Sequence, residues 1–277
     1  MPIRIPALIV VGFCVAGCLG AAAAAEPAQP QISGMYDAGA LVPLTVRDRS
    51  AYLITPTGTV DPGKRWVWIA PYWLGISRDG GEVEHRMYVE RLLAAGFHVA
   101  GVNVGTSCGS PTGAEVFQEF YELLLERYGL NPKVRLIGQS NGGLIAYAWA
   151  FRHPQSVDKI AGIYPATDFR TWPMLPQVIT YPDPGLGYNL TLDELTGRIA
   201  EFNPIDNLEP LAKAGVRILH IHGDKDELVP MEPNSTELAR RYEELGGTAE
   251  IVVIAGLAHG GKVFYESEPF IGFLLAD

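Results

Sequence analysis

The sequence predicts an α/β fold, a mostly parallel sheet with helices on both faces. Short apolar segments alternate with amphipathic ones from about residue 66 to the C-terminus, and Gly or Pro ends many of them. Of the 277 residues, 48% are hydrophobic, which suits one domain with a large core. In such a sheet, sites form at the carboxyl ends of the strands.

Two segments near the N-terminus, residues 41–46 and 51–55, are expected to form an antiparallel edge of this sheet, followed by a turn over 57–64. The remaining strands are expected at residues 66–72, 97–103, 134–138, 159–164, 216–221 and 250–254. Helices are expected at 82–95, from a capping box of Thr112 and Glu115 to Gly129, and at 141–151, 234–245 and 266–275.

Residues 1–25 have the pattern of a secretory signal peptide, with Arg4 before a short apolar run and alanines before Glu26. Residues 26–40 are expected to be a linker, and residues 41–277 the domain. We therefore expect export to the periplasm or the extracellular space. An alternative stays open, because Val15-Ala16-Gly17-Cys18 resembles a bacterial lipobox that would anchor the protein to a membrane through Cys18.

Removal of residues 1–25 would take away Arg4 and no acidic residue, leaving 20 basic and 31 acidic residues and a net charge of −11. This charge argues against nucleic acid and against anionic membrane surfaces as partners. Only Cys108 lies outside the segment that contains Cys14 and Cys18, so the processed soluble form is expected to have no intramolecular disulfide.

The strongest chemical signal is Gly138-Gln139-Ser140-Asn141-Gly142, a G-x-S-x-G pattern between an apolar strand and a helix. A nucleophile elbow needs this context, since its Ser sits on a strained turn above the sheet and its neighbours must be small. A Ser that only caps the helix is the alternative. We expect Ser140 to be the nucleophile.

Serine needs a base, and His259 follows the last strand in a loop of small residues, Gly256 to Gly261. The orienting acid should follow the preceding strand, where Asp224, Asp226 and Glu227 compete. Asp168, after the strand at 159–164, is a further candidate.

The elbow, the His loop and the stretch His222-Gly-x-x-Asp226-x-x-Val229-Pro230 resemble the prolyl-oligopeptidase-like and dienelactone-hydrolase-like branch of the α/β-hydrolase superfamily, over roughly residues 64–277. The resemblance implies an α/β-hydrolase fold and selects Asp226 as the acid. It departs from the family in two places. A true dienelactone hydrolase has Cys at the position of Ser140, and most relatives have His-Gly where this chain has Ala70-Pro71.

The oxyanion hole is expected to use the N–H of Asn141 and one N–H from the loop after the strand at residue 66. Pro71 has no N–H, so Tyr72 is the expected donor and Trp73 the second choice. A lid insertion is expected at about residues 166–205, where aromatic residues either line a substrate pocket or pack the lid onto the body. The loop at residues 105–111 is expected to face the site, and Trp73, Cys108 and Trp172 are expected to line the pocket. For Cys108 a small unreactive filler is the favoured alternative, because no base is evident beside it.

No cofactor motif is evident, and no metal site is expected, because His220 and His222 are taken to point to opposite faces of their strand. The sequence thus predicts an exported serine hydrolase that cleaves carboxylic esters through an acyl-enzyme, with a small-molecule or oligosaccharide ester as substrate. Two alternatives stay open. One is a peptidase of the prolyl-oligopeptidase type, in which charged residues such as Glu82, Glu84 and Arg86 would grip a peptide terminus. The other is a non-catalytic binding protein on a hydrolase scaffold.

Overall fold

The computed structural model describes residues 36–72, 86–171, 178–179 and 182–277. These residues belong to one unit, Ser33–Asp277. The expected signal peptide with Cys18, most of the linker, and the pocket residues Trp73 and Trp172 lie outside the described residues.

A central sheet of eight strands organises this unit, in the order β1-β2-β4-β3-β5-β6-β7-β8. The first two strands pair antiparallel to each other, and β2 pairs antiparallel to β4, whereas all other neighbours are parallel. The expected antiparallel edge is therefore confirmed. The strands are β1 (Gly39–Val46), β2 (Arg49–Pro56), β3 (Trp66–Ala70), β4 (His98–Val102), β5 (Val134–Gln139), β6 (Val157–Ile163), β7 (Arg217–Gly223) and β8 (Thr248–Ile254).

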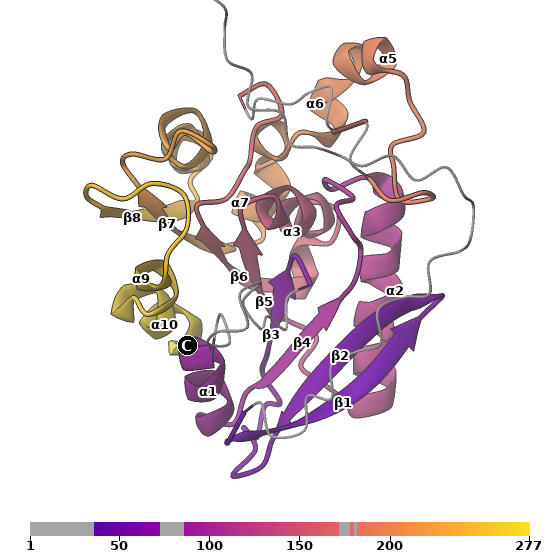
Figure 1. Ribbon diagram of the computed structural model, residues 1–277, viewed down its shortest axis with the longest axis vertical. Helices are drawn as coiled ribbons and strands as arrows, with labels where there is room; N and C mark the ends of the chain where they lie inside the picture. The colour runs from indigo at the N-terminus through magenta and orange to yellow at the C-terminus, as the bar shows by residue number, and fades with distance from the viewer. Residues whose placement is uncertain (1–35, 73–85, 172–177, 180–181) are drawn as a thin grey trace, which may run out of the picture. The chain divides into compact units, whose positions relative to one another are not determined.

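Helices cover both faces of the sheet, as predicted (Figure 1). One face packs against α2 (Pro111–Tyr128), α3 (Gly142–Ala150), α7 (Glu209–Lys213) and α8 (Glu237–Glu244). The other face packs against α1 (Arg86–Ala94), α9 (Lys262–Tyr265) and α10 (Glu268–Leu275). Alternate residues of β3 point to opposite faces of the sheet. Trp66 and Trp68 pack in the core on the side of α2 and α3, and Val67 and Ile69 pack in the core on the side of α1 and α10.

Several element ends differ from the sequence prediction. β3 stops at Ala70 instead of residue 72, since Pro71 has no N–H for the ladder. The predicted capping box at Thr112 is wrong: Ser110 caps α2 and accepts a hydrogen bond of 3.0 Å from the N–H of Gly113, with Pro111 in the first turn. The end at Gly129, with φ 62°, is confirmed.

The last helix, expected at 266–275, is confirmed as α10, and the short α9 before it was not predicted. A π-helical turn over Glu232–Thr236 precedes α8. The 3-10 turns are Pro154–Ser156 and Pro204–Asp206.

The segment between β6 and β7, where a lid was expected, contains α5 (Leu192–Gly197) and α6 (Ile199–Phe202) before α7. A capping box of Thr191 and Glu194 begins α5. Tyr188 packs edge-on against Phe202, with ring centroids 5.3 Å apart, and its hydroxyl donates to the carbonyl of Cys108 over 2.9 Å. This aromatic residue therefore attaches the segment to the body of the domain. Among the described residues, no helix has the length and apolar character that crossing a membrane requires.

Candidate active site

The turn between β5 and α3 has the geometry of a nucleophile elbow. Ser140 lies at its apex with φ 50°, in the left-handed region that a non-glycine residue adopts at a cost of roughly 1–3 kcal/mol. A Cβ atom on Gly142 would come within 2.0 Å of the carbonyl oxygen of Ala70, and one on Gly143 within 2.5 Å of that of Ala166. The small residues after Ser140 are therefore required by close backbone contacts with two other loops.

Three side chains meet above the carboxyl ends of the strands. The Ser140 hydroxyl lies 3.0 Å from Nε2 of His259, which follows β8. Nδ1 of the same ring lies 2.8 Å from Oδ2 of Asp226, which follows β7. With a neutral ring, Nδ1–H donates to the carboxylate and the serine hydroxyl donates to Nε2. This connected geometry is the one that allows the imidazole to accept the serine proton.

The environment of Asp226 favours its charged form. Burial opposes ionisation, but the adjacent His222 ring and the hydrogen bonds from His259 and from the N–H of Val229 outweigh it and hold the pKa of Asp226 below its usual value. Oδ1 accepts from the N–H groups of Leu228 and Val229, at 3.0 and 2.8 Å, which leaves Oδ2 to face His259.

The rival carboxylates have other partners or positions. Asp224 accepts a hydrogen bond of 2.6 Å from the N–H of Gly256 and thereby joins the loops after β7 and β8. Asp168 accepts from the side chains of Asn203 and Arg170, at 2.8 and 3.2 Å. Glu227 is exposed. Of the four candidates, Asp226 is the one hydrogen-bonded to His259.

A cavity of about 460 Å³ opens beside Ser140 and His259. Its lining includes both residues proposed for the oxyanion hole, Asn141 and Tyr72. Asn141 directly follows Ser140, and Tyr72 directly follows Pro71 after β3, so two separate loops supply backbone at the cavity. The second choice of donor, Trp73, lies outside the described residues.

Gly105 and Thr106 of the loop at residues 105–111 line the cavity as expected, whereas sequence reasoning missed three lining residues with polar side chains, Asn103, Gln139 and Tyr164. The ring of Tyr164 lies against the imidazole of His259, with centroids 4.2 Å apart. Each of the three follows or ends a parallel strand, β4, β5 or β6, and a position at the carboxyl end of a strand is the sequence signal that could have identified them.

The prediction that Cys108 lines the pocket is wrong. Its side chain is fully buried in a core with Leu144 and Phe169, because the backbone at Cys108 turns with φ 50°. Burial raises the pKa of the Cys108 thiol to about 12, against the opposing hydrogen bond from the Asn141 side chain. The alternative, an unreactive filler, agrees with these contacts.

The placement of His220 and His222 on opposite faces is also wrong. Residues two apart in a strand point to the same side, and Nδ1 of both rings contacts the hydroxyl of Ser235, at 2.9 and 2.8 Å. Among the described residues, no group of three or more His, Cys, Asp or Glu side chains is arranged to hold a metal ion.

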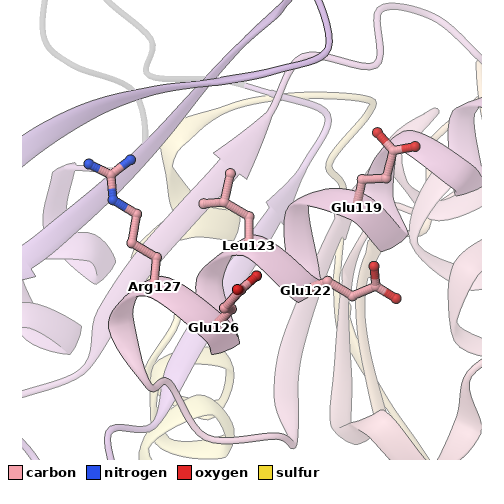
Figure 2. Close-up of a pocket in the computed structure, with 5 residues that line it drawn as sticks. All are labelled: Glu119, Glu122, Leu123, Glu126 and Arg127. Atoms are coloured by element: carbon pink, nitrogen blue, oxygen red, sulfur yellow. The ribbon is translucent and has the colours of Figure 1, made fainter.

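A second depression, of about 580 Å³, lies along the outer side of α2 (Figure 2). Glu119, Glu122, Leu123, Glu126 and Arg127 line it. It is larger than the cavity at Ser140, but it has no nucleophile and no imidazole. Its charged side chains are exposed, as is usual for the solvent side of an amphipathic helix.

Comparisons with known proteins place this geometry in a family. A model described as the prolyl oligopeptidase family matches residues 116–274, more than half of the chain and including Ser140, Asp226 and His259. No curated protein sequence matches the chain.

Solved structures with the same fold have low sequence identity. A puromycin-hydrolyzing peptidase of Mycobacterium tuberculosis has a TM-score of 0.64 at 15% identity, over 86% of this chain and 39% of that one. Dipeptidyl peptidase 4 of Porphyromonas gingivalis has a TM-score of 0.63 at 13% identity, over 85% and 35%. A truncated carbohydrate esterase from gut microbiota has a TM-score of 0.60 at 18% identity, over 82% and 88%.

The chain thus corresponds to about 39% of the length of the puromycin-hydrolyzing peptidase, whereas the truncated esterase has a comparable length. Together with the parallel sheet, the family match confirms the fold class predicted from the sequence. The chain belongs to the prolyl oligopeptidase family and has the α/β-hydrolase fold.

Proposed function

We propose that this protein is a serine hydrolase that cleaves carboxylic esters, with Ser140 as nucleophile, His259 as general base and then general acid, and Asp226 as the group that orients His259. One observation carries the preference for esters: the described residues that line the cavity include no Lys, Arg, Asp or Glu. A peptidase that binds a charged peptide terminus needs a buried or partly buried counter-charge near its nucleophile. This lining suits an uncharged acyl group.

In the proposed reaction, the Ser140 oxygen attacks the acyl carbon while Nε2 of His259 takes the hydroxyl proton. The N–H groups of Asn141 and Tyr72 are proposed to stabilise the oxyanion, and each such donor typically contributes about 10²–10³ in rate. Collapse of the intermediate breaks the ester C–O bond, and His259 gives its proton to the departing alcohol. Water, deprotonated by the same imidazole, then attacks the acyl-enzyme and releases the acid and Ser140.

Two further observations support an ester substrate of modest size. A cavity of about 460 Å³ lies within the usual range for small-molecule sites. A truncated carbohydrate esterase of comparable length has the same fold, which supports an acylated sugar as the substrate class.

The second candidate is a peptidase, which the family and the two peptidase neighbours favour. The charged groups considered for a peptide terminus do not add support within the described residues. Arg86 forms ion pairs with Asp37 and Glu90, and Glu82 and Glu84 lie outside those residues.

A panel of p-nitrophenyl esters and aminoacyl-nitroanilides distinguishes the candidates, with Ser140→Ala as control. We expect ester turnover that the control abolishes. Anilide turnover without ester turnover would reject the ester proposal in favour of the peptidase. If neither substrate is turned over and a fluorophosphonate probe leaves Ser140 unlabelled, the protein is a binding module on a hydrolase scaffold.

Export, and anchoring through Cys18, stay predictions from the sequence of residues 1–25. Fractionation of cells that express the full chain tests both. Export predicts the processed protein outside the cytoplasm, and anchoring predicts that Cys18→Ser moves it from the membrane to the soluble fraction.

A further inference from the structure

His222 lies at the end of β7, fully buried and four residues before Asp226. Its Nε2 is 2.8 Å from the carbonyl oxygen of Val229 and 3.5 Å from Oδ2 of Asp226. Because a carbonyl oxygen only accepts, Nε2 must carry a hydrogen. The shorter contact is the hydrogen bond, and the longer one places the positive edge of the ring beside the carboxylate.

The hydrogen on Nε2 determines the donors along a buried chain of side chains. In a neutral ring, Nδ1 of His222 accepts, so the Ser235 hydroxyl donates to it over 2.8 Å. The same oxygen then accepts from Nδ1–H of His220 at 2.9 Å, and Nε2 of His220 accepts from the Tyr147 hydroxyl at 2.9 Å. Burial, and secondarily His222, lower the pKa of His220 to about 3, so that ring is neutral at ordinary pH.

This series of hydrogen bonds ends at the loop that positions the Asp226 carboxylate. Val229 is held on both sides, since its N–H donates to Oδ1 of Asp226 over 2.8 Å and its carbonyl accepts from His222. Oδ2 remains for His259 at 2.8 Å. Without the His222 N–H, the Val229 carbonyl would lose its partner and one side of the carboxylate would lose a positive neighbour.

We propose that His222 is a positioning residue, which holds the loop from Asp226 to Val229 so that Oδ2 meets Nδ1 of His259 in the geometry needed for proton transfer. This inference rests on the proposed catalytic role of Ser140, Asp226 and His259. Asp226 faces His222 from the loop, and His220 faces it through Ser235. Behind His220 lies Tyr147 of α3, and on the far side of the carboxylate His259 packs against Tyr164.

Two substitutions distinguish the effect of losing the Nε2–H donor of His222 from the effect of losing the ring. In His222→Gln the amide reaches about as far as Nε2 and can donate to Val229. In His222→Asn the amide can accept from Ser235 but is too short to reach Val229. We expect His222→Asn to lower kcat by roughly 10- to 100-fold through misorientation, with KM changed less than about threefold. We expect His222→Gln to recover most of the loss.

The pH profile supplies a readout that a purely structural role would not move. A carboxylate that has lost this positive neighbour attracts the imidazolium proton more strongly, so the acid limb of kcat/KM in His222→Asn should move upward by about half a pH unit or more. In His222→Gln the limb should return toward that of the wild type. Tyr242→Phe is a matched control, because it removes a buried hydroxyl that donates to the carbonyl of Val216 and should lower Tm without moving the limb.

If His222→Asn does not fold, Ser235→Ala takes its place as the test variant. Ser235→Ala keeps the rings of His220 and His222 and removes the hydroxyl that donates to His222. The acid limb of kcat/KM is then expected to move in the same direction by a smaller amount. A folded variant with the kcat and pH profile of the wild type would overturn the proposal. Equal losses in His222→Asn and His222→Gln with an unmoved limb would do so too. A wild-type protein without Ser140-dependent turnover would instead reject the proposed function.

Discussion

Replacing Gly142 by alanine tests whether the backbone contacts behind Ser140 hold the site together. The added Cβ would lie 2.0 Å from the Ala70 oxygen and 2.5 Å from Cδ of Pro71. Real Cβ contacts essentially never fall below 3.0 Å, so the Ala70 carbonyl or the start of α3 must move by about 1 Å. Overpacking of this kind typically costs about 1–3 kcal/mol and sometimes more.

The displaced backbone leads directly to Tyr72, so activity should fall with stability. For a domain of this size, about 3 kcal/mol corresponds to a decrease in Tm of roughly 6–12 °C. We expect kcat for a p-nitrophenyl ester to fall by about 10² or more, because both proposed oxyanion donors flank the contact. Differential scanning calorimetry and initial rates measure the two effects.

Gly272→Ala is the matched control. Gly272 lies in α10, is exposed, and nothing lies within 4 Å of an added Cβ. The same substitution should therefore raise stability by up to about 1 kcal/mol through helix propensity, with no change in kcat. A Gly142→Ala variant with the Tm and kcat of the wild type would refute the reasoning.

Three further predictions concern His220, Asp226 and Cys108. Burial lowers the pKa of His220 to about 3, so protonation of this ring opposes folding. The free energy of unfolding should be highest above the unfolded-state pKa of about 6.5 and should decrease as the pH falls toward 3, by about 2 kcal/mol at pH 5. Urea unfolding at pH 7 and 5 should show a smaller decrease in His220→Gln, and an equal decrease would count against the assignment. Asp226→Asn should lower kcat by about 10⁴ while the protein stays folded by circular dichroism; a loss below tenfold would exclude Asp226 as the orienting acid. The Cys108 thiol, fully buried and with its pKa raised to about 12, should react with a disulfide reagent only after unfolding, and rapid labelling of the native protein would contradict this.

Elements that depend on neighbouring residues were predicted well from the sequence. The elbow at Ser140 needs small residues on both sides, and the end of α2 needs Gly129 in a left-handed conformation. The alternation of segments also predicted the parallel sheet, since apolar strands buried on both faces differ in pattern from amphipathic helices.

Errors arose where the partner was distant or the local rule was misapplied. Thr112 and Glu115 fit a capping box, but Ser110 takes that role, and Glu115 lies 3.6 Å from Arg47 of the β1–β2 turn. His220 and His222 were placed on opposite faces although strand alternation places them on the same one. Cys108 was assigned to the cavity because its loop was expected there, but its side chain is buried in the core with Leu144 and Phe169, at a backbone φ of 50°.

The sequence by itself determined the residue types of the site and the strand ends at which they lie, because the order of alternating segments specifies which loops share an edge of the sheet. The family resemblance had already selected Asp226 as the acid, and only the tertiary structure showed how its carboxylate meets His259 and which side chains support it. The atoms concerned come from segments as far apart as Ser140 and His259, 119 residues in sequence, and local patterns carry no information on such contacts. Hydrogen bonds depend on distances of a few tenths of an ångström, and those follow only from the packed strands and loops.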